Sequence, residues 1–153
     1  MIEGEEVRSP SVQMPIQPDG NAVLVSSHEQ VLGGNTGQVY LGCRFPALDD
    51  YRSMIQEQAL RIGAVLSSKG VIGRFAIDFL LTRSPGEAWQ SQALEINLRM
   101  GGTTPPYHAL EFLTSGSLNP ETGIFYAPTG QEKFYAATEN LKSPAYRGLL
   151  PED

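Results

Sequence analysis

The stretch that decides the fold is residues 74–104, which read RFAIDFLLTRSPGEAWQSQALEINLRMGGTT. It predicts two strands, residues 70–82 and 92–99, joined by a turn that contains Pro85 and Gly86. Side chains alternate between the two faces along a strand. The first strand therefore places Arg74, Ala76 and Asp78 on one face, and its opposite face is wholly apolar.

The second strand shows the same division into a polar face and an apolar face. If the two strands pair as a hairpin, Glu95 and Asn97 converge with Asp78 on one spot. Carboxylate and amide oxygens are hard ligands of the type that suits Mg²⁺ with bound phosphates. The apolar face of this strand is expected to pack against a core, and it consists of Leu94, Ile96 and Leu98.

These residues resemble the metal-binding end of the ATP-grasp carboxylate–amine ligases, most of all the branch that contains pheganomycin-type peptide ligases. The resemblance covers nearly the whole chain, and it rests on Asp78-Phe79, residues 94–99 and 101–104, with further landmarks at residues 4–6, 9–13 and 30–34. It implies an α+β fold, the C-terminal subdomain of an ATP-grasp domain, in which an antiparallel sheet is packed by one long and one short helix.

The resemblance also implies a set of site residues. Asp78, Glu95 and Asn97 are the implied ligands of Mg²⁺, and ATP is the implied nucleotide. Arg99 shares their face and is the catalytic candidate, because its planar guanidinium can clamp a phosphate or a carboxylate. The alternative for Arg99 is an ion pair with Glu95 or Asp78. Arg74 is a second candidate for the same clamp.

Further candidates for nucleotide binding lie outside the two strands. By the resemblance Glu6 would bind the ribose hydroxyls of ATP, and the alternative is a solvated glutamate. His28 either touches the ligand or is a structural hydrogen-bonding residue. Gly101 and Gly102 let the backbone approach a ligand closely. The other two candidates are Thr103 and Thr104, in a turn that is expected to cradle a phosphate or a substrate carboxylate. Thr104 is the predicted N-cap residue of a short helix.

The remaining elements follow from turn signals and periodicity. A hairpin is predicted from residues 12–16 and 22–26, a glycine-rich loop at 31–37, and a strand at 38–43. A long helix is expected to have Asp49 or Asp50 as its N-cap and to end at Gly70. Arg52, Glu57 and Arg61 fall outside its apolar stripe, which consists of Tyr51, Met54, Ile55, Ala59, Ile62, Val65 and Leu66. The short helix after Thr104 ends near residue 116, and a small hairpin is predicted from residues 124–126 and 133–137.

Composition narrows the class of protein. The chain has 153 residues, enough for about one domain. A net charge of −6 argues against nucleic acid as a partner. The single cysteine, Cys43, excludes an internal disulfide and fits a reducing compartment. No apolar run is long enough to span a bilayer, so a cytoplasmic protein is expected.

The chain also departs from the family. A histidine commonly follows the two threonines in this branch, whereas Pro105 stands there and His108 comes three residues later. The phosphate-binding lysines of the upstream subdomain have no counterpart, since the first lysine is Lys69. Residues 1–153 are therefore expected to form one partial ATP-grasp domain, with the upstream subdomain absent and the C-terminal end truncated. The isolated chain is expected to be inactive without a complementing subdomain.

Two functions remain open from the sequence. The first is the C-terminal portion of an ATP-dependent ligase that joins a small carboxylate to an amine through an acyl phosphate. The second is a non-catalytic binding or interaction domain derived from this fold. A third interpretation, a merely solvated sheet face, is disfavoured because two acids, an asparagine and an arginine share that face.

Overall fold

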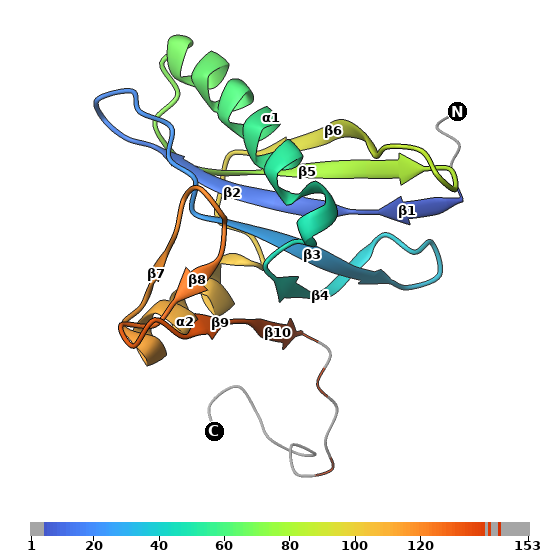
Figure 1. Ribbon diagram of the computed structural model, residues 1–153. Helices are drawn as coiled ribbons and strands as arrows, with labels where there is room; N and C mark the ends of the chain where they lie inside the picture. Colours follow the sequence, from blue (N-terminus) through green and yellow to red (C-terminus); the bar gives the residue numbers. More distant parts are fainter. Residues whose placement is uncertain (1–4, 140, 142–143, 145–153) are drawn as a thin grey trace.

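The computed structural model describes residues 5–139, 141 and 144 (Figure 1). In this part of the chain, seven strands form one antiparallel sheet, and three short strands form a second sheet. The main sheet contains β1 (Glu6–Arg8), β2 (Pro10–Ile16), β3 (Ser26–Gly33), β4 (Val39–Phe45), β5 (Gly73–Arg83), β6 (Gln90–Asn97) and β10 (Tyr135–Thr138). The predicted α+β class is confirmed, with one long and one short helix packed against the sheet.

The order of the strands puts the predicted hairpin at one edge. Strand β5 pairs with β1 and β2 on one side and with β6 on the other, and β3, β4 and β10 follow beyond β2. The β5–β6 hairpin is confirmed, but β6 ends at Asn97. Arg99 therefore lies in a bend rather than in the strand, because the chain leaves the sheet there to reach the second helix.

The long helix α1 (Asp49–Ser68) covers one face of the sheet (Figure 1). Tyr51, Ile55 and Ala59 are buried against β2 and β5 as predicted. Two expectations for this helix were wrong. Its N-cap residue is Leu48, whose N–H donates to the Glu29 carboxylate, so the aspartates lie in the first turn. Val65 is 55% exposed, whereas the next residue, Leu66, packs against the core.

Arg52 of α1 is buried, although its charge predicted an exposed position. Its guanidinium donates to the backbone carbonyls of Ala47 and Thr122 and forms an ion pair with Asp49. A buried arginine is tolerated when its donors are satisfied. Arg52 thus ties the start of α1 to the distant loop that carries Thr122.

The apolar face of β6 was expected to be buried, and it is not. Ile77 of β5 is fully buried, whereas its partner Ile96 is 43% exposed. Leu94 occupies a bulge without a partner on β5, and Leu98 is 59% exposed. Alternation predicted the face correctly, but α1 packs on β2 and β5 and leaves the edge strand uncovered.

The first hairpin also differs from the prediction. Residues 22–25 form no strand apart from an isolated bridge between Ile16 and Ala22. Strand β3 begins at Ser26 and runs through much of the predicted loop to Gly33. The turn that follows contains Gly34 and Gly37, both at positive φ. Strand β4 extends two residues beyond the predicted end because it pairs with both β3 and β10.

The C-terminal third forms a second small core. Helix α2 (Thr104–Thr114) packs there, with Phe45, Tyr107, Leu110 and Phe125 buried together. The predicted hairpin was partly wrong, since β8 (Phe125–Tyr126) pairs with β7 (Ser117–Leu118) and β9 (Glu132–Lys133), while Tyr135 begins a strand of the main sheet. No helix of the described residues is long and apolar enough to cross a membrane.

Candidate metal and nucleotide site

One row of side chains crosses four neighbouring strands on the face away from α1. Asp78 of β5 lies opposite Glu95 of β6 on one side and opposite Ser11 of β2 on the other. Ser11 in turn lies opposite His28 of β3. Residues directly opposite each other in an antiparallel pair share a face. The row therefore brings together positions that are far apart in the sequence.

A cavity of about 440 Å³ opens on this face above Asp78 and Glu95. Seven of the predicted site residues line it: Asp78, Glu95, Asn97, Arg99, Gly101, Gly102 and Thr103. The sheet supplies the first three, and the bend and turn after β6 supply the others. The convergence predicted for the hairpin is thus present in the structure, and the turn before α2 forms part of the same wall.

Asp78 is the half-buried carboxylate at the centre of the cavity. Its Oδ1 accepts a hydrogen bond of 2.7 Å from Gln30 Nε2, and its Oδ2 accepts one of 3.1 Å from Asn97 Nδ2. Burial and the nearby charge of Glu95 raise the pKa of Asp78, and the two amide hydrogen bonds and Arg99 oppose that rise. The two facing carboxylates therefore repel each other, and a cation between them would relieve that repulsion.

Arg99 makes no ion pair with a carboxylate in the described part of the chain. Its guanidinium donates a hydrogen bond from Nη1 to the Met100 carbonyl, at 3.3 Å, and its side chain is exposed. The guanidinium is thus available for an anion at the edge of the cavity. Arg74 does not line the cavity, but it shares with Arg99 a small neighbouring depression beside Thr104.

The turn before α2 is hydrogen-bonded to the side chain of Gln13 on β2. Thr103, rather than the predicted Thr104, is the N-cap residue of α2. Both hydroxyls face the buried Gln13 amide: Thr103 accepts its N–H, and Thr104 donates to its oxygen at 3.0 Å. The threonine side chains are therefore engaged inside the protein. What the turn offers to the cavity is mainly its backbone.

Gly102 has a steric reason to be glycine. A Cβ atom at this position would lie 2.6 Å from Tyr40 Cε1 and 2.9 Å from Glu139 Oε1. Contacts that short do not occur in folded proteins. The absence of a side chain thus lets the turn close against β4 and the end of β10, which completes the cavity wall.

Four predicted residues do not line the cavity: Arg74 and Thr104 lie at the neighbouring depression, and Glu6 and His28 are engaged elsewhere. Glu6 is bound through both carboxylate oxygens to Arg83, at 3.1 Å each. His28 is fully buried among the rings of Phe45, Tyr107 and Tyr135, and its Nε2 lies 2.6 Å from the Tyr135 hydroxyl. Burial lowers the pKa of His28 to about 3, so its ring is neutral near neutral pH.

Several residues that line the cavity were not among the predicted site residues: Ser11, Gln30, Gln38, Tyr40 and Glu139. The sequence did contain a pattern that could have placed Gln30 on the cavity face. Gln30 stands two positions after His28, so a strand through residues 26–33 would have placed both on one face. The predicted strand ended at residue 26, so Gln30 stood between that strand and the predicted loop at 31–37 and was assigned to neither. Glu139 and Tyr40 had no local signal, since tertiary contacts alone bring them to the cavity.

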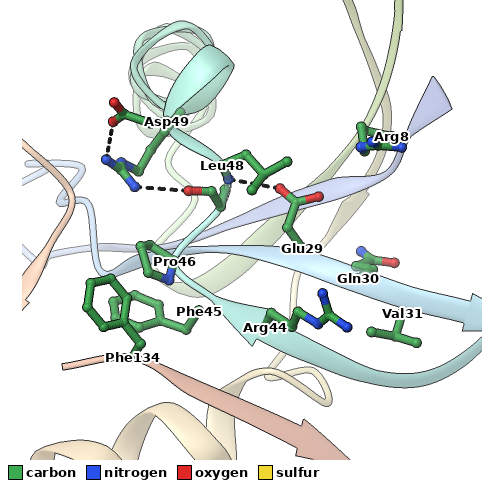
Figure 2. Close-up of a pocket in the computed structure, with 12 residues that line it drawn as sticks. Arg8, Glu29, Gln30, Val31, Arg44, Phe45, Pro46, Leu48, Asp49 and Phe134 are labelled. Atoms are coloured by element: carbon green, nitrogen blue, oxygen red, sulfur yellow. Dashed lines mark hydrogen bonds and ion pairs between the residues drawn. The ribbon is translucent and has the colours of Figure 1, made fainter. Parts of the chain in front are cut away.

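A second cavity, of about 510 Å³, lies on the α1 side of the sheet. Figure 2 shows Glu29 and Arg44 on neighbouring strands below the start of α1. Arg8 and Phe134 also line this cavity, and none of the predicted site residues does. Its two carboxylates are already engaged, Glu29 by the Leu48 N–H and Asp49 by Arg52, and three guanidinium groups share the lining, so it does not suit a divalent cation.

The IQCH-like ATP-grasp family matches residues 2–121, which is most of the chain. The chain belongs to the ATP-grasp family. This confirms the membership that the 74–104 stretch predicted. The L-propargylglycine–L-glutamate ligase of Streptantibioticus cattleyicolor is 36% identical over 143 residues. That match covers 94% of this chain but only 28% of the relative, so the chain spans less than a third of the relative's length.

Solved structures show the same fold. A Rhizobium etli pyruvate carboxylase crystallised without acetyl coenzyme A superposes with a TM-score of 0.56 at 16% identity, covering 77% of this chain and 11% of that one. The biotin carboxylase domain of Hydrogenobacter thermophilus 2-oxoglutarate carboxylase, in complex with MgADP, ADP and bicarbonate, gives 0.55 at 15% identity, covering 74% and 23%. Both likenesses concern the ATP-grasp architecture.

Proposed function

We propose that this chain supplies the Mg²⁺- and ATP-binding face of an ATP-dependent carboxylate–amine ligase. One observation carries the proposal: Asp78, Glu95 and Asn97 line a single cavity with Arg99, whose guanidinium makes no ion pair with any described carboxylate. Membership of the ATP-grasp family supports ATP as the nucleotide, and the 36% identity to an amino-acid ligase supports amide formation.

The residues present fit a magnesium ion. Asp78 and Glu95 offer carboxylate oxygens from directly opposite positions, and Asn97 offers an amide oxygen because its Nδ2 is the atom that faces Asp78. Mg²⁺ prefers oxygen ligands and usually keeps one or two protein carboxylates together with substrate phosphates. When bound, the ion would neutralise charge on the phosphate oxygens of ATP.

The proposed reaction has two steps. A carboxylate oxygen of the first substrate attacks the γ-phosphorus of ATP, and ADP leaves, which gives an acyl phosphate. The amine nitrogen of the second substrate then attacks the acyl carbon, inorganic phosphate leaves, and an amide remains. Arg99 would stabilise the charge of the transferring phosphoryl group through its paired N–H donors. The substrate class is a small carboxylate and a small amine.

The turn after β6 and the neighbouring Arg74 have supporting roles in this proposal. The backbone at Gly101, Gly102 and Thr103 closes the wall beside the phosphates, and Arg74 provides positive charge near Arg99. Glu6 and His28 are not included, because the side chain of Glu6 is bound to Arg83 and that of His28 is buried.

Isothermal titration of the chain with ATP, with and without Mg²⁺, tests the proposal. Binding that depends on Mg²⁺ in the unchanged chain and is lost in Glu95→Ala is the expected result. Glu87→Ala is the matched control, since Glu87 is an exposed glutamate in the turn at the far end of the same hairpin. ATP binding that is absent at millimolar nucleotide, or equally strong in Glu95→Ala, would contradict the proposed site.

A further inference from the structure

Gln30 reaches Asp78 across an intervening strand. Gln30 belongs to β3 and Asp78 to β5, and β2 lies between them. Neighbouring strands are about 4.8 Å apart, so the two backbones are separated by about 10 Å. The small residue Ser11 lies opposite Asp78 on β2. The long side chain of Gln30 therefore passes over β2 to place Nε2 2.7 Å from Asp78 Oδ1.

The contact belongs to a two-sided clamp on the carboxylate. Gln30 donates to Oδ1 and Asn97 donates to Oδ2, from opposite sides of Asp78. A carboxylate oxygen has two lone pairs, so each oxygen of Asp78 keeps one for a cation. With both oxygens engaged, rotation about the Cβ–Cγ bond of Asp78 would break two hydrogen bonds. The clamp thus fixes which way the remaining lone pairs point.

We propose that Gln30 is a positioning residue, which orients Asp78 toward the cation of the Mg²⁺–ATP site. This inference rests on the proposed function of the cavity. Gln30 itself lines the cavity and is half-buried, so its amide lies beside the ligands rather than in a separate core. Partners that hydrogen-bond to metal ligands orient them, and their loss typically lowers metal affinity about 10- to 100-fold.

A purely structural role is the competing explanation. In that case Gln30 only ties β3 to β5, and its loss lowers stability without changing the affinity for metal. The positioning role and the structural role can be distinguished by measuring metal affinity on folded protein, at temperatures well below unfolding. Gln30→Met keeps the length of the side chain but removes its N–H donors, so it tests the hydrogen bond with little change in packing.

The experiment is a titration with Mn²⁺ in the presence of ATP, followed by the electron paramagnetic resonance signal of free Mn²⁺. Gln30→Met is expected to raise the Kd for Mn²⁺ at least about tenfold. Gln92→Met, an exposed glutamine on β6 that does not line the cavity, is the control and is expected to leave the Kd unchanged. Gln30→Ala is the second variant, in case the methionine packs poorly.

A second measurement needs no metal. A double-mutant cycle of Gln30→Met and Asp78→Ala, followed by urea unfolding, measures the coupling between the two side chains. A hydrogen bond to a charged group predicts a coupling of about tenfold or more in the unfolding equilibrium constant. Coupling together with a raised Kd for Mn²⁺ supports the positioning role.

The remaining outcomes overturn the inference in distinguishable ways. If Mn²⁺ binds the unchanged chain and is lost in Glu95→Ala, but Gln30→Met and Gln30→Ala bind it normally, Gln30 is only a structural cross-link and the proposed function stands. If the unchanged chain binds no Mn²⁺ with ATP, the proposed function fails, and the positioning role fails with it.

Discussion

Acidification should destabilise this protein through His28. The ring is fully buried, and its Nδ1 has no hydrogen-bond partner among the described residues. Burial lowers the pKa of His28 from 6.5 to about 3. Between these two pKa values, His28 is therefore protonated in the unfolded chain and neutral in the folded chain. The stability that comes from the neutral ring is fully present above pH 6.5 and is lost as the pH falls from 6.5 toward about 3.

The size of the effect follows from linkage. With those two pKa values, lowering the pH from 7 to 5 should cost about 2 kcal/mol of unfolding free energy. Full loss across the window would be about 5 kcal/mol, at 1.36 kcal/mol for each unit of pKa shift. Asp78 has a raised pKa and contributes a slope of the opposite sign at lower pH. That contribution is common to all the variants below and cancels when they are compared.

Urea unfolding at pH 5, 6 and 7 measures this slope. His28→Gln removes the titrating ring and keeps a polar partner for the Tyr135 hydroxyl, so it should lose about 2 kcal/mol of the pH dependence. His108→Gln is the matched control, because it makes the same substitution at a side chain that is 42% exposed. If His28→Gln loses stability on acidification as steeply as the unchanged chain, the argument from burial is refuted.

Three further predictions concern the fold. Arg52→Ala leaves buried carbonyls without their donor and should cost about 2–4 kcal/mol in urea unfolding, whereas Arg61→Ala, at an exposed surface ion pair, should change stability by less than about 0.5 kcal/mol. Equal effects would contradict the role given to Arg52. Gly42→Ala should detach β10, because a Cβ at φ +153° would lie 2.1 Å from the Ala137 carbonyl oxygen; faster amide exchange in residues 135–138 is the readout, and unchanged protection there would argue against it. Ser26→Ala should change the free energy of unfolding by less than about 1 kcal/mol, since its buried hydroxyl has no hydrogen-bond partner among the described residues; a larger loss in urea unfolding would contradict this assignment.

The local patterns of the sequence determined a large part of this protein. Strict alternation assigned Asp78, Glu95 and Asn97 to one face, and the structure places all three in one cavity. The period of the apolar residues located α1, and the family motif identified the ATP-grasp fold. These signals are readable because alternation and helical periodicity depend on the backbone of a single element.

The tertiary structure alone decided what covers each face and which distant groups meet. Ile77 and Ile96 share a face of one hairpin, yet only Ile77 is buried, because the apolar residues of α1 pack on β2 and β5. Arg52 is buried by a loop that lies 70 residues away in the sequence. Gln30 meets Asp78 by reaching across β2, which lies between their strands. Alternation along a strand does not reveal this order of strands. Burial and reach across strands depend on how elements pack, so sequence periodicity cannot supply them.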